Sequence, residues 1–252
     1  MARTKTFVSR ALTLVTDLDG TFLGGSKQDR RQLYNLIESN RESIGLLFVT
    51  GRSFKNVQPL FEQFHMPVPD CMICDVGTSI YRHDGTWLLS DLQEEIARKW
   101  GQGHALVDQA LQTLEGLEHQ ELLGPYRKSY FYSSEHAALK GKAIVESLGF
   151  DGLLSDRKYF DVLPKGVNKG STLIRVIQSL GIDGDSVLIA GDTLNDLSML
   201  SLGLPAVAVG NSEPQLLAAL EDSTFLYRAS KPGAAGILEA LDQHPLLRKL
   251  GL

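Results

Sequence analysis

Short, uninterrupted apolar runs that each end in a polar turn recur along the chain and constrain its fold more than any other feature. They are LTLVTD, IGLLFVTG, CMICDVG, SVLIAGD and PAVAVGN, at 12–17, 44–51, 71–77, 186–192 and 205–211. Because these runs lack polar alternation, we expect strands that are covered on both faces, as in a parallel sheet. Helical patterns alternate with the runs, at 30–40, 54–64, 169–180, 213–222 and 234–241. This alternation predicts right-handed β-α-β units and an α/β fold with a doubly wound parallel sheet.

The middle of the chain follows a different pattern. Segment 79–89 alternates in polarity and carries Asp84-Gly85, which favours a hairpin turn. The following patterns predict a helix through 91–116, a strand over 126–133, a helix over 136–148 and short strands at 151–155 and 158–164. Such a mixture is typical of an α+β insert. We therefore predict a core of 1–82 and 162–252, interrupted by a cap of 83–161.

Composition limits the classes of partner. The chain has 252 residues and a net charge of −5, which argues against nonspecific nucleic-acid binding. No apolar run reaches about 18 residues, so we expect no membrane span, and we interpret the first residues as a short tail before the first strand. Cys71 and Cys74 lie in a predicted buried strand, where positions i and i+3 face opposite sides, so we interpret them as structural. Two cysteines and no export signal suit a reducing environment, so we expect a cytoplasmic protein. We expect it to be a monomer or small homo-oligomer.

Polar side chains gather at the points where the predicted parallel strands meet their following loops or helices. The carboxyl ends of such strands form the ligand crevice of an open α/β sheet. Three aspartates are expected there, Asp17, Asp192 and Asp196, and they repel one another unless a cation neutralises them. Hard oxygen ligands without clustered Cys or His indicate Mg²⁺.

Groups suited to phosphate lie beside the expected cation. Thr50 offers a hydroxyl, Gly51 an unobstructed amide and Lys169 a positive charge at a helix start. A metal and a lysine facing a carboxylate suit in-line attack on phosphorus. Asp17 would be the nucleophile and form an aspartyl-phosphate, while Asp19 would protonate the leaving oxygen and then activate water.

Two other enzyme classes fit parts of this pattern. A D-x-D motif after a strand also holds the metal-bound nucleotide sugar in many glycosyltransferases, although that function gives no role to Lys169. A phosphosugar mutase would share the same core and would pass the phosphoryl group to a second sugar hydroxyl. Both remain alternatives to a phosphatase at this point.

Four segments in order resemble the motifs of the haloacid dehalogenase superfamily, namely DLDGT, VTGR, NKGS and GDTLND. The first motif has a second aspartate, and in this it resembles the same motif of the phosphatase and phosphomutase branches. The resemblance implies a Rossmann-like core in which Asp17, the main-chain carbonyl of Asp19 and Asp192 ligate Mg²⁺. It also implies that Asn195 and Asp196 support the metal and its waters or Lys169. A cap inserted between the second and third motifs is a further habit of this superfamily.

Within the superfamily, the chain is most similar to sucrose-phosphatases and related disaccharide-phosphate phosphatases. The resembling segments are VGTSIY, YRKSYFY, FDVLPKGVNKG, VGNSEPQLL and SKPGAAGILEAL. The chain departs from the family at Ser79, where Glu is usual, at Arg127, where Lys is usual, and at Tyr159, where the family favours Asp. The resemblance implies a phosphatase acting on a sucrose-phosphate-like or other disaccharide or glycoside phosphate. The departures fall on the segments expected to face the sugar.

Three residues are candidates for substrate contact. Arg127 occupies a family position in the cap, and Arg52 follows the second predicted strand. Asp161 lies in an apolar strand and needs a polar partner such as a sugar hydroxyl. Lys128, in contrast, has a basic neighbour, and only one of two adjacent strand residues can face the crevice.

Overall fold

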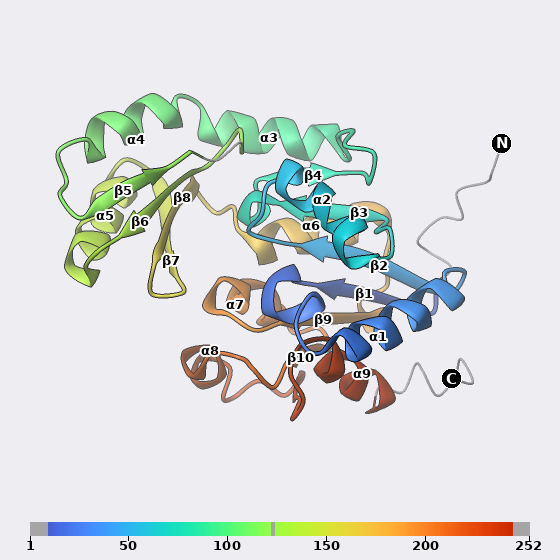
Figure 1. Ribbon diagram of the computed structural model, residues 1–252. Coiled ribbons are helices and arrows are strands. Elements are labelled where there is room, and N and C mark those ends of the chain that lie inside the picture. Colours follow the sequence, from blue (N-terminus) through green and yellow to red (C-terminus); the bar gives the residue numbers. More distant parts are fainter. Residues whose placement is uncertain (1–9, 122–123, 244–252) are drawn as a thin grey trace.

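The structure is a computed structural model, which describes residues 10–121 and 124–243. The tail expected at 1–9 lies outside these residues. Seven strands form the main sheet in the order β11-β10-β9-β1-β2-β3-β4, parallel except for β4 (Figure 1). Their bounds are β1 (Leu12–Thr16), β2 (Ile44–Val49), β3 (Cys71–Cys74), β4 (Ser79–Tyr81), β9 (Val187–Gly191), β10 (Ala206–Ala208) and β11 (Leu226–Arg228).

Helices cover both faces of the main sheet, as the apolar runs predict. One buried cluster joins the sheet to α1 (Lys27–Ser39), α2 (Phe54–Phe64) and α9 (Gly233–Gln243). The opposite cluster joins it to α3 (Ser90–Trp100), α6 (Lys169–Leu180), α7 (Leu197–Leu200) and α8 (Pro214–Ala219). Cys71 and Cys74 belong to different clusters, which confirms that they point to opposite faces. Burial raises the pKa of Cys71 to about 12 and that of Cys74 well above its usual value.

A second, antiparallel sheet, which we call the cap sheet, has the order β5-β6-β8-β7. Its strands are β5 (Leu117–Gln120), β6 (Lys128–Tyr132), β7 (Phe150–Ser155) and β8 (Tyr159–Pro164), and its helices are α4 (Gly103–Leu111) and α5 (Glu135–Ser147). Figure 1 shows α3 and α4 leading from the main sheet to the cap sheet. Trp100 is buried in the apolar cluster between these elements, where it acts as a packing residue.

Local signals fix the helix that matters most for the site. Asn168 caps the start of α6, where its side chain accepts a hydrogen bond from the Ser171 amide and its own amide donates to the Ser171 hydroxyl. This reciprocal cap satisfies two amide groups that a helix start otherwise leaves unpaired. It also places Lys169 in the first turn, directly beneath the carboxyl end of the main sheet.

Of the expectations for the middle of the chain, one helix needs correction and the hairpin is confirmed. The helix predicted over 91–116 is two helices, because Gly101 has a left-handed φ of 51° and ends α3. The hairpin predicted over 79–89 is confirmed, with its turn at Asp84-Gly85. The Arg82 amide donates to the Thr86 carbonyl, the Leu88 amide donates to the Ile80 carbonyl, and Tyr81 forms an antiparallel bridge with Trp87. The first strand of the hairpin, β4, pairs with β3 of the main sheet. In the described parts of the chain, no helix is both long and apolar enough to cross a membrane.

Candidate active site

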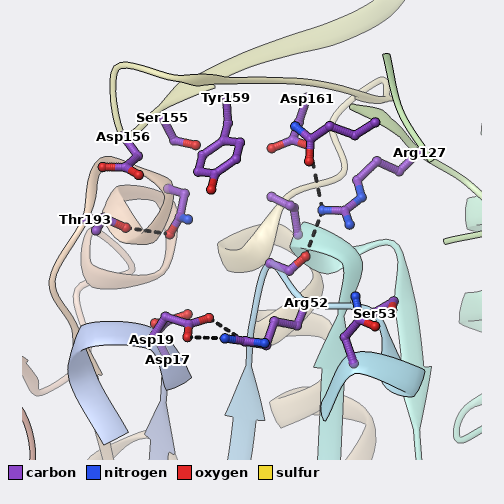
Figure 2. Close-up of a pocket in the computed structure, with 15 residues that line it drawn as sticks. Asp17, Asp19, Arg52, Ser53, Arg127, Ser155, Asp156, Tyr159, Asp161 and Thr193 are labelled. Carbon is purple, nitrogen blue, oxygen red and sulfur yellow. Dashed lines mark hydrogen bonds and ion pairs between the residues drawn. The ribbon is translucent and has the colours of Figure 1, made fainter. Parts of the chain in front are cut away.

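A pocket of about 460 Å³ lies between the carboxyl end of the main sheet and the cap sheet (Figure 2). The main-sheet side contributes loops after β1, β2, β3 and β9, and the cap side contributes residues of β5, β7 and β8. The lining residues are Asp17, Asp19, Gly51, Arg52, Ser53, Asn56, Val76, Gln120, Arg127, Ser155, Asp156, Tyr159, Asp161, Thr193 and Asn195. Seven of the residues predicted from sequence are therefore in one cavity.

Lys169 is fully buried beneath this pocket and donates hydrogen bonds to three side chains. Its Nζ lies 2.7 Å from Asp17 Oδ1, 2.8 Å from Asn195 Oδ1 and 2.6 Å from Asp196 Oδ1. Burial alone would lower the pKa of Lys169, but the two carboxylates outweigh that effect and the pKa is raised. The lysine is thus held in its charged form beside the first strand.

Three aspartates meet next to this lysine. Carboxylate oxygens of Asp17, Asp192 and Asp196 lie within 4.8 Å of one another. Burial raises the pKa of Asp17 well above its usual value, and Asp196 and Asp192 add to that rise while Lys169 opposes it. Burial, with Asp196 next, raises the pKa of Asp192 to about 7. A cluster of this kind is stabilised by binding a cation, which favours the ionised forms.

Asp196 and Asn195 are already engaged by their neighbours. Oδ2 of Asp196 accepts hydrogen bonds from the amides of Asp192 and Thr193, and its Oδ1 accepts from Lys169. Asn195 Oδ1 accepts from Lys169 and from the Thr193 hydroxyl. Both side chains therefore brace the loop after β9 and the lysine, which fits the supporting role that the resemblance implies.

The turn after β1 packs tightly against the loop after β9. Gly20 has a φ of 77°, and a Cβ at this position would lie 2.1 Å from Asp192 Oδ2, so a side chain has no room there. The next residue, Thr21, donates its hydroxyl to Asp192 Oδ1 at 2.6 Å. These contacts explain why Gly-Thr follows the aspartate pair in DLDGT.

Asp19 points into the open pocket, and its carboxylate pairs with Arg52. The guanidinium donates from Nε to Oδ2 and from Nη2 to Oδ1, both at 2.7 Å. The hydrogen bond with Asp19 is the largest cause of the raised pKa of Arg52. Figure 2 shows this pair crossing the floor of the pocket from the loop after β2 to the loop after β1.

Thr50 and Gly51 form the start of the loop after β2. The Thr50 side chain is buried, and its Oγ1 accepts a hydrogen bond of 3.1 Å from the Arg52 amide. Gly51 lines the pocket itself. The loop is held to the neighbouring strand because the Thr50 amide donates to the Ile73 carbonyl at 2.8 Å.

Arg127 and Asp161 occupy the cap side of the pocket, and both are buried. Arg127 donates to the Gly51 carbonyl at 2.8 Å and lies 3.6 Å from Asp161 Oδ1. Asp161 also accepts a hydrogen bond from the Ser129 hydroxyl. The adjacent basic residue, Lys128, pairs instead with Asp108, and it is not among the described residues that line this pocket.

Several polar residues that line the pocket are not predicted from the sequence, and neither are two that contact site residues from outside the lining. Asp75 follows β3, is buried and forms an ion pair with Arg127. Asn211 follows β10, and its amide nitrogen donates to the Gly20 carbonyl at 3.1 Å and to Asp192 Oδ2 at 3.2 Å. Each comes just after an apolar run, so the rule that placed Asp17 could have found them too.

Comparisons with known proteins show the family of the chain, although the relatives are named for different activities. The family model for sucrose-6F-phosphate phosphohydrolase matches residues 10–244. A glucosylglycerol-phosphate synthase of Pseudomonas anguilliseptica is 45% identical over 242 residues, covering 96% of this chain and 32% of that protein. A mannosylfructose-phosphate phosphatase of Agrobacterium fabrum is 29% identical, covering 90% of this chain and 94% of that protein. The chain thus spans about a third of the first relative and nearly all of the second.

A solved structure shows the same likeness in three dimensions. The sucrose-phosphatase of Synechocystis, determined with sucrose and phosphate, is 26% identical and superimposes with a TM-score of 0.82. The match covers 93% of this chain and 98% of that structure. The resemblance to haloacid dehalogenase phosphatases is confirmed, and the chain belongs to the sucrose-6F-phosphate phosphohydrolase family.

Proposed function

We propose that this protein is a Mg²⁺-dependent phosphatase that hydrolyses a sugar phosphate through an aspartyl-phosphate on Asp17. The observation that carries the proposal is the hydrogen bond from the buried Lys169 to Asp17, at the edge of an acidic cluster and under an open pocket. A stability role alone does not account for three buried carboxylates around one lysine, because unpaired buried charge is costly.

The donor set fits magnesium. Asp17 and Asp192 offer carboxylate oxygens, and the main-chain carbonyl of Asp19 would complete the protein ligands, while Asn195 and Asp196 hold the surrounding loop. Mg²⁺ prefers such oxygen ligands with several waters retained. When bound, the cation would polarise a phosphoryl oxygen and neutralise the developing charge.

The residues of the chain divide the remaining work. Thr50, the amide of Gly51 and Lys169 would bind the phosphoryl oxygens, and Lys169 would also keep Asp17 ionised for attack on phosphorus. Asp19 would give a proton to the leaving sugar oxygen and later take one from the attacking water. Its carboxylate faces the pocket, as this role requires.

The substrate class follows from the cap side of the pocket and from the relatives. We propose that the division into a core of 1–82 and 162–252 and a cap of 83–161 separates phosphate handling from sugar binding. In this division, β8 crosses the boundary at 161, and α3 packs on the main sheet. Arg127, Asp161 and Tyr159 supply the polar cap surface of the pocket, and Arg52 supplies its floor. The relatives are named for glucosylglycerol phosphate, mannosylfructose phosphate and sucrose phosphate, so a phosphorylated glycoside is the expected substrate.

The test is phosphate release with Mg²⁺ across glucosylglycerol phosphate, mannosylfructose phosphate, sucrose 6-phosphate and simple hexose phosphates. We expect turnover of at least one glycoside phosphate that exceeds turnover of the hexose phosphates and is abolished by EDTA. Isomerised sugar phosphate without free phosphate would establish the mutase alternative. Binding of a nucleotide sugar with no phosphate release would favour the glycosyltransferase alternative.

A further inference from the structure

Arg127 connects the cap sheet to the loop that would bind phosphate. It immediately precedes β6, yet its Nη1 donates a hydrogen bond of 2.8 Å to the Gly51 carbonyl, in the loop after β2. Its Nη2 lies 3.3 Å from Asp75 Oδ1, in the turn after β3. Figure 2 shows the side chain reaching from the cap toward the core. The side chains of Arg127 and Asp75 are only 4% and 1% exposed, so this ion pair is buried between the cap sheet and the main sheet.

The Gly51 carbonyl belongs to the same planar peptide unit as the Arg52 amide. That amide donates a hydrogen bond of 3.1 Å to Thr50 Oγ1. Because the unit is rigid, the hydrogen bond from Arg127 at one edge restrains the N–H at the other edge. A threonine oxygen that accepts from this N–H keeps its own hydroxyl hydrogen available as a donor. The Arg127 guanidinium therefore influences the orientation of the Thr50 hydroxyl through this peptide unit.

Asp75 is placed by an unusual backbone. Asp75 and Val76 have φ values of 54° and 59°, a left-handed conformation that is uncommon for residues other than glycine and a genuine outlier for valine. The Asp75 amide donates a hydrogen bond of 2.9 Å to the Arg52 carbonyl. The Val76 amide donates one of 3.1 Å to the Thr50 carbonyl. The main chain of the turn after β3 is thus hydrogen-bonded to the loop after β2, while the Asp75 carboxylate faces Arg127.

We propose that Asp75 and Arg127 are positioning residues that couple the placement of the cap to the phosphate-binding hydroxyl of Thr50. The inference rests on the proposed function and deepens it. Arg127 comes from the cap and its acceptor from the core, so the link forms only when the cap lies over the pocket. The Thr50 hydroxyl is then aimed at phosphate in the closed arrangement and released when the cap moves away.

The geometry calls for arginine at this position. Its planar fork spans oxygens from three segments, namely the Gly51 carbonyl, Asp75 Oδ1 and Asp161 Oδ1 at 3.6 Å. A lysine would have to reach all three oxygens from one nitrogen, whereas the planar guanidinium divides them between Nη1 and Nη2, which are fixed relative to each other. Burial raises the pKa of Asp75, and Arg127 opposes that rise, which is consistent with a charged pair in this contact.

Two substitutions test the link without removing a phosphate ligand. Arg127→Lys keeps the charge and removes the fork, and Asp75→Asn removes the charge while keeping a residue that tolerates a left-handed backbone. The probe is inorganic phosphate with Mg²⁺, and the dissociation constant is measured by calorimetry. We expect each variant to bind phosphate about tenfold more weakly. The control is Asp108→Asn, which removes the carboxylate paired with the adjacent Lys128, and its phosphate affinity should match wild type.

A double-mutant cycle with Thr50→Val distinguishes positioning from a general structural effect. If Arg127 acts through the Thr50 hydroxyl, Arg127→Lys and Asp75→Asn change phosphate affinity by less than about twofold in the Thr50→Val background. Equal losses in both backgrounds, or no loss in the native background, would overturn the inference. Thermal melting checks that each variant is folded, and Arg127→Lys alone decides if Asp75→Asn does not fold. Wild-type protein that neither binds nor releases phosphate would overturn the proposed function as well.

Discussion

Arg52 holds the carboxylate of Asp19 with two parallel hydrogen bonds of 2.7 Å on the floor of the pocket. The pair is open to solvent, since the two side chains are 36% and 55% exposed. Exposed ion pairs contribute only about 0–1 kcal/mol to stability. The pairing is therefore better explained by orientation, because a bidentate contact fixes the plane of the carboxylate that we propose as the general acid and base.

Arg52→Gln should separate these two roles. We expect the free energy of unfolding to change by less than about 1 kcal/mol, and kcat/KM for phosphate release to fall about tenfold or more. Arg175→Gln is a matched control, because Arg175 forms a similar two-bond contact with Glu95 at 2.7 and 2.8 Å. The control should show the small stability change alone. Wild-type activity in Arg52→Gln would contradict the assignment.

Asp17→Asn should abolish phosphate release, and Asp19→Asn should reduce it severely, because one removes the nucleophile and the other the proton carrier. The metal-free Asp17→Asn protein should be no less stable than wild type. The pKa of Asp17 is raised well above its usual value by burial, so ionisation of this group near neutral pH opposes folding. Phosphate assays and urea unfolding with EDTA measure both effects. Near wild-type turnover in Asp17→Asn would show that the nucleophile lies elsewhere.

Lys169→Met should lose both activity and stability. Removing one partner of a buried ion pair costs about 3–5 kcal/mol, because the carboxylates of Asp17 and Asp196 are left unpaired. The loss should shrink as pH falls, since protonation of Asp17 removes part of the uncompensated charge. Urea unfolding of both proteins at pH 5 and pH 8 measures the difference. An equal loss at both values would argue that Lys169 acts through packing.

Magnesium binding should strengthen as pH rises through the neutral range. The pKa of Asp192 is about 7 in the metal-free protein against a usual value of 3.8, so the folded form binds this proton more tightly than the unfolded form does. Stability without metal should therefore fall as pH rises from about 4 through about 7. A metal ligand must lose its proton, so Mg²⁺ should raise the melting temperature more at pH 8 than at pH 6. Asp192→Asn should reduce this difference, because only the raised pKa of Asp17 would then contribute, whereas Asp222→Asn, an exposed control, should keep it in full.

Most of the site could be predicted from the sequence because residues that directly follow parallel strands meet at the carboxyl edge of the sheet. Asp17, Thr50 and Asp192 follow β1, β2 and β9, and these strands are adjacent in the sheet, so their carboxyl ends meet. Lys169 was found through its place at a helix start. Asp75 and Asn211 also follow strands, but the sequence alone gives no reason to single them out, because neither has an obvious part in phosphate chemistry.

Other features depend on contacts between distant segments. The strand β5 reads LEHQ, with no apolar alternation, and exists because it pairs with β6. The break between α3 and α4 at Gly101 falls inside an otherwise helical pattern, and Gly103 packs against the Trp100 ring. The partners of Arg127 come from three segments, 51, 75 and 161, whose proximity no local pattern encodes.

The burial of Cys71 and Cys74 has a practical consequence for measuring cap movement. Both thiols are buried in β3, next to the edge strand β4, and their raised pKa values leave almost no reactive thiolate at neutral pH. Toward thiol-directed dyes and spin labels, the native protein should behave as though it had no cysteine. A single cysteine placed at Leu139 on α5 and another at Phe225 beside β11, both exposed, would therefore label cleanly. The distance between the two labels, followed with and without phosphate, would report the opening and closing of the cap directly.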